Sequence, residues 1–351
     1  MRPAAEFLGT GFKPFSLRDD CMDARLQQGT LILLETLNAW FTGLHAWLFE
    51  TLVQPPMYAL GFMTYVEDAY DATEFFLYGC AEIVLLLLLF RPLEALWPLE
   101  RWPDRRAVRV DILYTLLHRL GLLPLIIFIL LSPLVDGFDG FLRLHNVIPH
   151  NLEELIPSLA GSALAAFLVY LLVLDLALYL LHRLQHHLNW WWALHSLHHS
   201  QRQLSFWADD RNHLLDDVLS DLWLVLVALL IGVPSGQFVL IVIVMRMVES
   251  LSHANTRLRF GWLGERLLVS PQFHRLHHGM TIGHEGPARG CNFAPLFPLW
   301  DILLRTANFS HGRIPTGISD QLEGSDYGDS FVRQQILGIK RLVHSVVGNR
   351  V

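Results

Sequence analysis

Three groups of histidines with nearly the same spacing lie in the second half of the sequence. They read HRLQHH at 182–187, HSLHH at 195–199 and HRLHH at 274–278. Residues three or four positions apart share one face of a helix, so each group can direct two or three imidazoles at one point. Neutral imidazole is a strong ligand for divalent iron, zinc and copper. The spacing therefore predicts that all three groups bind metal.

The histidines are too many for a single ion. Besides the three groups, His213 and His253 lie at the polar ends of a predicted helical hairpin. Structural zinc prefers a closed set of ligands that includes cysteine, and hydrolytic zinc takes about three protein ligands. Eight to ten converging imidazoles exceed both sets, so two metal ions are the simplest interpretation. Two iron ions held by nitrogen at the ends of membrane helices suit activation of dioxygen and attack on an unactivated C–H bond.

The remaining composition is typical of a membrane protein. Of the 351 residues, 52% are hydrophobic and 17% are charged, whereas about a quarter of the residues in soluble domains are charged. We predict an all-α integral membrane protein with four to six transmembrane or half-spanning helices and a cytoplasmic histidine-rich di-metal cap. Whether residues 31–53 cross the membrane or lie along its surface stays open. The apolar runs that carry this prediction are 75–90, 110–133, 158–181, 214–231 and 238–251.

Charges and cysteines restrict location and partners. The arginine-rich loop 101–109 belongs in the cytoplasm by the positive-inside rule, and the acidic loop 136–155 belongs outside. Every histidine group then faces the cytoplasm, from a bacterial inner membrane or from the endoplasmic reticulum. The net charge of −7 gives no support for nucleic-acid binding, which needs a basic surface. Cys21, Cys80 and Cys291 are far apart, which argues against a disulfide scaffold or a thiolate zinc site.

In this order, and with a hairpin before the third, the histidine groups resemble the histidine boxes of the fatty acid hydroxylase/sterol desaturase superfamily of integral-membrane di-iron enzymes. The resemblance covers residues 158–306 and extends to DLALYLLHR, RNHLLD, SHANTRL and NFAPLFPLWDILLRT beside the boxes. The chain then divides into a cytoplasmic polar arm at 1–29, N-terminal membrane helices and loops at 30–157, the catalytic domain at 158–306 and a C-terminal cytoplasmic tail at 307–351.

The resemblance also implies which residues hold the metals. Asp216 stands in a His-Leu-Leu-Asp stretch where the family has His-Pro-Leu-Glu, so it fills an acidic position with a shorter side chain. Asp175 lies seven residues before His182, and we expect it to orient a ligand imidazole or to pair with another polar group in the membrane. Asp301 either supports a ligand or caps the final segment. The implied ligands are His182, His186 or His187, His195, His198, His199, His213, His253, His274, His277 and His278.

The implied reaction is O2-dependent hydroxylation or desaturation of a lipid, either a sterol, a fatty acyl chain or an ether lipid. Two iron ions would carry it, with zinc an alternative occupant in purified protein. The sequence has no His-Pro-Gly-Gly heme stretch, so electrons are expected from an external cytochrome b5-like protein, a ferredoxin or a reductase. Two alternatives stay open: a carotenoid or alkane hydroxylase, and a non-catalytic metal-binding transporter or sensor. A transporter should show broken helices at the membrane midplane, whereas these ligands gather at the ends of spans.

Overall fold

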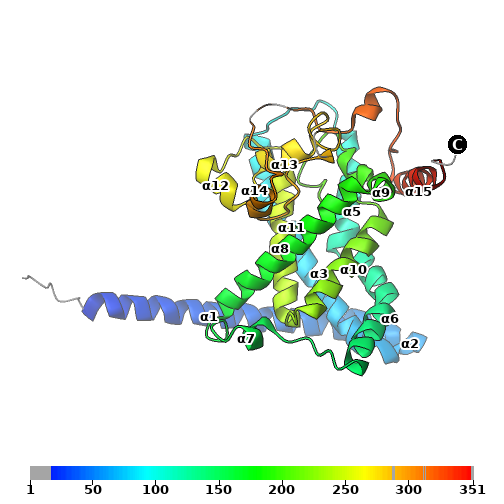
Figure 1. Ribbon diagram of the computed structural model, residues 1–351. Coiled ribbons are helices and arrows are strands. Elements are labelled where there is room, and N and C mark those ends of the chain that lie inside the picture. Colours follow the sequence, from blue (N-terminus) through cyan, green and yellow to red (C-terminus); the bar gives the residue numbers. More distant parts are fainter. Residues whose placement is uncertain (1–16, 287–288, 311, 313, 349–351) are drawn as a thin grey trace, which may run out of the picture. The chain divides into compact units, whose positions relative to one another are not determined.

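The computed structural model describes residues 17–286, 289–310, 312 and 314–348. Within them the regular structure is helical apart from one isolated antiparallel bridge, between Gly279 and Thr316, which confirms the predicted all-α class (Figure 1). The helices are α1 (Leu17–Leu48), η1 (Phe49–Val53), α2 (Gln54–Leu60), η2 (Met63–Tyr65), α3 (Val66–Leu85), η3 (Leu86–Phe90), α4 (Arg91–Leu96), α5 (Arg106–Arg119), α6 (Leu122–Leu144), α7 (Leu152–Leu155), α8 (Ala163–His187), α9 (Asn189–His199), α10 (Leu214–Leu230), α11 (Ser235–His253), α12 (Gly261–Leu267), α13 (Pro271–His277), α14 (Leu299–Leu303), η5 (Ser319–Leu322) and α15 (Phe331–Val347).

The chain forms two compact units, residues 1–74 and residues 75–351. In the first unit, α1 continues through η1 into α2. The residue after α2, Gly61, has a φ of 75°, the left-handed conformation common after a helix. Of the polar arm predicted at 1–29, residues 1–16 lie outside the described residues and the others begin α1. The metal-ligand candidates all belong to the second unit.

Four described helical stretches are long and apolar enough to cross a membrane: Met63–Leu96, Leu122–Leu144, Ala163–His187 and Ser235–His253. Their number agrees with the predicted four to six membrane helices. The stretch 31–53, whose placement the sequence left open, forms most of α1 together with η1 and is not one of the four.

The predicted span at 110–133 is wrong, because two helices share this stretch. α5 ends at Arg119, and α6 begins at Leu122 after Gly121 adopts a φ of 81°. A positive φ is readily accessible to glycine and breaks the helix there. Leucines stand on both sides of the glycine, so the hydropathy stays high across the point where one helix ends and the next begins. The membrane-spanning candidate is therefore α6, and α5 leads into it.

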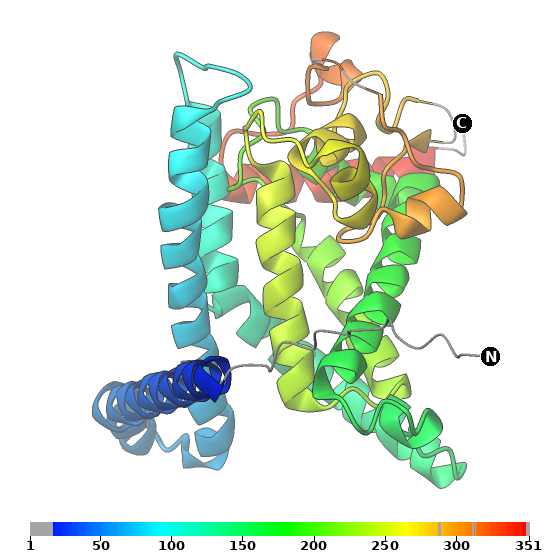
Figure 2. The same ribbon diagram turned by 90° about the vertical axis from the view of Figure 1, so that its left-hand side faces the viewer.

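The hairpin predicted before the third histidine group is confirmed. α10 and α11 are joined by a turn in which Gly232 has a φ of 63°. Within residues 75–351, α8, α10 and α11 run side by side, and α9, α13 and the loops around them gather at one end (Figures 1 and 2). The core between the three long helices is apolar, and its buried members include Tyr170, Leu171, Leu174, Ala228, Ile241 and Met245.

The predicted C-terminal tail contains a helix that packs against the histidine-bearing part of the molecule. α15 lies along α9 in both views (Figures 1 and 2). Gly338 of α15 faces the ring of His213 so closely that a Cβ atom would collide with the imidazole. The end of the chain thus supports the helix that carries the second histidine group.

Candidate metal centre

Nine of the predicted histidine ligands converge in two neighbouring clusters. In each cluster the candidate ligand atoms lie within 4.8 Å of one another. Site 1 consists of His182, His186, His195, His199 and His277, and site 2 consists of His198, His253, His274 and His278.

The His-x-x-His-His spacing divides the second and third groups between the two sites, whereas the first group supplies ligands to site 1 alone. On α9, His195 and His199 are one helical turn apart and enter site 1, whereas His198 enters site 2. The group at α13 does the reverse. His274 and His278 enter site 2, and His277 enters site 1. Because i and i+4 share a helix face and i+3 is offset from it, one short motif supplies ligands to both sites.

The backbone orients most of the imidazoles of site 1. Their Nδ1 atoms donate to carbonyl oxygens of the segment 289–293, so their Nε2 atoms point toward the centre of the site. The Nε2 atoms of His182 and His277 are buried without a protein partner. The distances are 2.7 Å for His182 to Phe293, 3.1 Å for His186 to Arg289 and 2.8 Å for His277 to Cys291.

Asp216 is the carboxylate that orients a ligand of site 1. Its Oδ2 atom lies 3.0 Å from Nδ1 of His195, and its Oδ1 atom accepts from Trp191 Nε1 at 2.7 Å and from Gln185 Nε2 at 2.8 Å. This places the Nε2 atom of His195, which is buried without a partner, toward the site. A carboxylate behind a ligand imidazole fixes the tautomer and raises its basicity, so Asp216 lies where the family resemblance placed an acid.

Site 2 is held less firmly. The Nδ1 atoms of His198, His274 and His278 are buried without a hydrogen-bond partner, and only His253 is anchored, by the carbonyl oxygen of Glu249 at 2.7 Å. The four Nε2 atoms face one another, with distances of 3.2 Å for His253 to His198, 3.0 Å for His274 to His253 and 3.1 Å for His278 to His274.

The imidazole nitrogens of the two sites are suited to binding metal cations. Burial, reinforced by the neighbouring imidazoles, lowers the pKa of His198, His199, His274, His277 and His278 well below the ordinary value, so these rings are neutral at physiological pH. Neutral imidazole is the metal-binding form. Each neutral ring has one acceptor nitrogen, and several such nitrogens facing one another leave lone pairs without a proton. A metal ion in each site would satisfy them, and the all-nitrogen set suits iron, zinc or copper.

Asp175 does not orient a ligand imidazole, contrary to one of the roles expected for it. Its carboxylate accepts hydrogen bonds from the backbone N–H groups of Leu296 and Phe297 at 2.9 and 3.1 Å, and from Trp300 Nε1 at 2.9 Å. It therefore has the alternative role, that of a buried acid paired with other polar groups, and it fixes the segment that follows the 289–293 carbonyls.

Asp301 supports a ligand through the backbone. It accepts from the N–H groups of Phe293 and Ala294, both at 2.9 Å, and from the hydroxyl of Thr306 at 2.6 Å. The carbonyl oxygen of Phe293 is the acceptor for His182. Asp301 thus supports site 1 indirectly: it holds Phe293, and Phe293 orients the imidazole of His182.

Two expected ligands lie outside both clusters. Nδ1 of His187 donates to the carbonyl oxygen of Arg183 at 2.8 Å, so His186 is the member of this pair that belongs to site 1. His213 caps α10 instead. Its Nδ1 atom accepts from the N–H of Leu215 at 3.1 Å, and its Nε2 atom lies 3.0 Å from the carbonyl oxygen of Gln335. With both nitrogens in use, His213 has no lone pair for a metal.

Replacing His213 with alanine is therefore expected to leave the metal content unchanged. Loss of the N-cap should lower the free energy of unfolding by about 1 kcal/mol. Metal analysis of purified protein, together with thermal unfolding in detergent, checks both parts. A loss of one ion per chain in this variant would return His213 to the ligand set.

Sequence reasoning missed the carbonyls that orient the site 1 imidazoles, because every residue has a carbonyl and no side chain marks the ones in use. It also left His284 unassigned. This imidazole stacks on Trp192 with ring centroids 3.6 Å apart and lies 5.7 Å from the ring of His186. Burial lowers its pKa to about 4. His284 thus covers site 1 from outside, and nothing in its local sequence spacing indicated this.

Comparisons with known proteins agree with the geometry. Residues 167–306 match the family described as fatty acid hydroxylase, and this segment contains all nine clustered histidines, so the resemblance inferred from the histidine boxes is confirmed. An ornithine lipid hydroxylase of Rhizobium tropici is 31% identical over 136 residues, which are 39% of this chain and 40% of that protein. A Delta(7)-sterol 5(6)-desaturase of Gibberella zeae is 27% identical over 142 residues, which are 40% of this chain and 42% of that protein. The matches therefore span about two fifths of each relative. No solved structure matches this chain.

Proposed function

Because residues 167–306 match the fatty acid hydroxylase family, we propose that this protein is a membrane-bound, O2-dependent hydroxylase or desaturase of a lipid. The observation that carries the proposal is the pair of adjacent, buried histidine clusters at the ends of long apolar helices. The names of the two relatives, a hydroxylase of one lipid and a desaturase of another, support an oxidation of this class.

The substrate is proposed to reach the site from the bilayer. α8 and α11 are both apolar enough to cross a membrane, and each ends in a ligand, His186 near the end of α8 and His253 at the end of α11. An apolar molecule moving along these helices would meet the metal centre without leaving the membrane. A sterol, a fatty acyl chain and an ether lipid all meet this requirement.

Two iron ions are the proposed cofactor, one held by the five histidines of site 1 and one by the four of site 2. When bound, iron supplies the activation of dioxygen that attack on an unactivated C–H bond requires. The protein contributes neutral imidazoles directed by the 289–293 carbonyls and by Asp216. Eight of the nine histidines are buried, which would exclude water and protect a reactive oxidant. Zinc can occupy such nitrogen-rich sites during purification.

The metal-bearing end is proposed to face the cytoplasm and to receive electrons from an external donor. The arginine-rich loop that begins at Arg101 is attached to this end. Next to it, Glu100 pairs with Arg275 at 2.7 Å and its backbone N–H donates to Asn255 at 3.0 Å. The positive-inside rule applied to this loop then assigns both sites to the cytoplasmic side. A cytochrome b5-like protein, a ferredoxin or a reductase could dock there.

The test is lipid analysis of cells that express the protein under 18O2. Lipid extracts are compared with those from cells that express a His277→Ala/His198→Ala variant. A new lipid that carries one 18O atom would identify a hydroxylase, and a lipid lacking two hydrogens would identify a desaturase. An unchanged lipid profile, with metal bound and an electron donor supplied, would contradict the proposal and favour a metal-binding protein without oxidative chemistry.

A further inference from the structure

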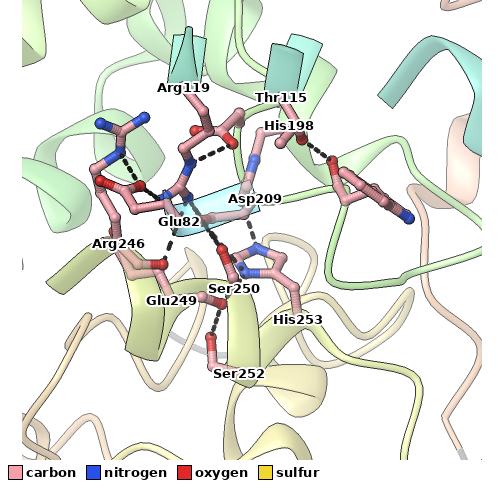
Figure 3. A network of polar contacts seen from close by, with 12 residues as sticks. Glu82, Thr115, Arg119, His198, Asp209, Arg246, Glu249, Ser250, Ser252 and His253 are labelled. Carbon is pink, nitrogen blue, oxygen red and sulfur yellow. Dashed lines mark hydrogen bonds and ion pairs between the residues drawn. The ribbon is translucent and has the colours of Figure 1, made fainter. Parts of the chain in front are cut away.

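A completely buried arginine lies at the end of α5, outside the segment that matches the family. Arg119 is 1% exposed, and its guanidinium contacts side chains from three different parts of the chain (Figure 3). Its partners are Glu82 of α3 at 2.5 Å, Asp209 at 2.8 Å, Asp210 at 3.0 Å and the hydroxyl of Ser250 on α11 at 3.0 Å.

The arrangement satisfies a charge that is costly to bury. Removing a guanidinium from water is unfavourable unless its donors are paired in good geometry, and here the planar fork is matched by three carboxylates. Burial by itself would raise the pKa of Asp210, but the charges of Arg119 and Arg246 bring it below the ordinary value. Loss of Arg119 would remove the partner that Glu82, Asp209 and Asp210 share.

The network ends at site 2. Asp209 binds Arg119 through Oδ2, and its Oδ1 atom lies 3.7 Å from Nδ1 of His253. Ser250, one turn before His253 on α11, donates to the same Oδ2 atom at 2.8 Å. Figure 3 shows Asp209 between Arg119 and His253, with His198 also beside the imidazole of His253. Arg119 thus fixes both the carboxylate beside His253 and the end of the helix that carries it.

His253 is the member of site 2 on which the others depend. It is the only one of the four ligands whose Nδ1 atom has a hydrogen-bond partner, and its Nε2 atom is within 3.2 Å of those of His198 and His274. Site 1, in contrast, has several ligands anchored by carbonyls and by Asp216. A disturbance behind His253 should affect one site and leave the other in place.

We propose that Arg119, paired with Glu82, is a positioning group for site 2: from helices before the family-matched segment, it holds Asp209 beside His253. This inference rests on the proposed two-metal function. In physical terms, a buried ion-pair network on α3 and α5 holds the end of α11, and the metal affinity of site 2 depends on it. Residues 75–119 are then part of the metal centre and not only a membrane anchor.

Cobalt(II) binding to the metal-free, detergent-purified full chain tests the proposal. Site 2 offers four imidazoles and site 1 offers five, and the visible absorption of cobalt(II) depends on coordination number, being strongest for four-coordinate ions. The variants are Arg119→Lys, which keeps the charge but loses the planar fork, and Asp209→Asn, which keeps the size but loses the charge. Asp301→Asn is the matched control, because this carboxylate is also buried and supports site 1 through Phe293.

In Arg119→Lys and Asp209→Asn, the cobalt equivalent with the stronger visible bands should bind about 10- to 100-fold more weakly, while the other equivalent binds as in the parent. Asp301→Asn should retain the stronger bands. Circular dichroism and gel filtration identify a variant that fails to fold. If Arg119→Lys does not fold, Asp209→Asn is the variant that tests the proposal. Unchanged binding of both equivalents, or equal weakening of both in folded variants, would overturn the proposal. A parent chain that binds fewer than two equivalents would instead contradict the two-metal function on which it rests.

Discussion

Replacing His277 with alanine is expected to abolish lipid oxidation and to lower the bound metal from about two ions per chain to about one. His277 is the α13 ligand of site 1, with its ring 4.4 Å from that of His182 and 4.6 Å from that of His199. Without it, the site loses the only ligand that α13 supplies, and a reaction that needs both ions stops. Since even residues behind a ligand change metal affinity by about 10- to 100-fold, loss of the ligand itself should lower activity by more than about a hundredfold.

The measurements are metal analysis by mass spectrometry and product formation from membrane lipids. The matched control is His187→Ala, because this histidine belongs to the first histidine group but lies outside both clusters. That control should retain both ions and most of the activity. Equal losses in the two variants would show that metal binding follows the number of histidines and not the clusters seen in the structure.

Replacing Asp175 with alanine is expected to destabilise the protein strongly. The substitution leaves three donors without their acceptor, namely the buried N–H group of Leu296 and the partly buried N–H groups of Phe297 and the Trp300 indole. An unsatisfied buried donor costs about 1–3 kcal/mol, so the free energy of unfolding should fall by about 3 kcal/mol or more. Thermal unfolding in detergent, followed by tryptophan fluorescence, measures the change.

Asp175→Asn separates hydrogen bonding from charge. The amide keeps one acceptor oxygen, and the loss of stability should therefore be smaller than in the alanine variant. Metal content should fall only as far as the protein unfolds, because no described contact joins Asp175 to a clustered histidine. A folded Asp175→Ala protein with normal stability but without metal would instead restore the ligand-orienting role expected from the sequence.

The sequence by itself determined the class of fold and which histidines are candidates to bind metal. Helix periodicity places residues three and four positions apart on neighbouring faces, so the three histidine groups and their metal-binding role could be predicted without knowing what they pack against. Hydropathy likewise predicted helices long enough to cross a membrane, four of which the structure contains. It failed at Gly121, where a single backbone angle divides a continuous apolar run.

Only the tertiary structure decided how the ligands divide and what holds them. His195 and His277 meet in site 1, although they lie 82 positions apart in the sequence, and no local pattern shows that the fold brings them together. The sequence predicted His213 to be a ligand, but its Nε2 atom pairs with the carbonyl oxygen of Gln335 on α15, more than a hundred residues later. The carbonyl acceptors of site 1 and the Arg119 network were hidden for the same reason. A hydrogen bond depends on which distant atom lies within about 3 Å, and short-range spacing in the sequence does not contain that information.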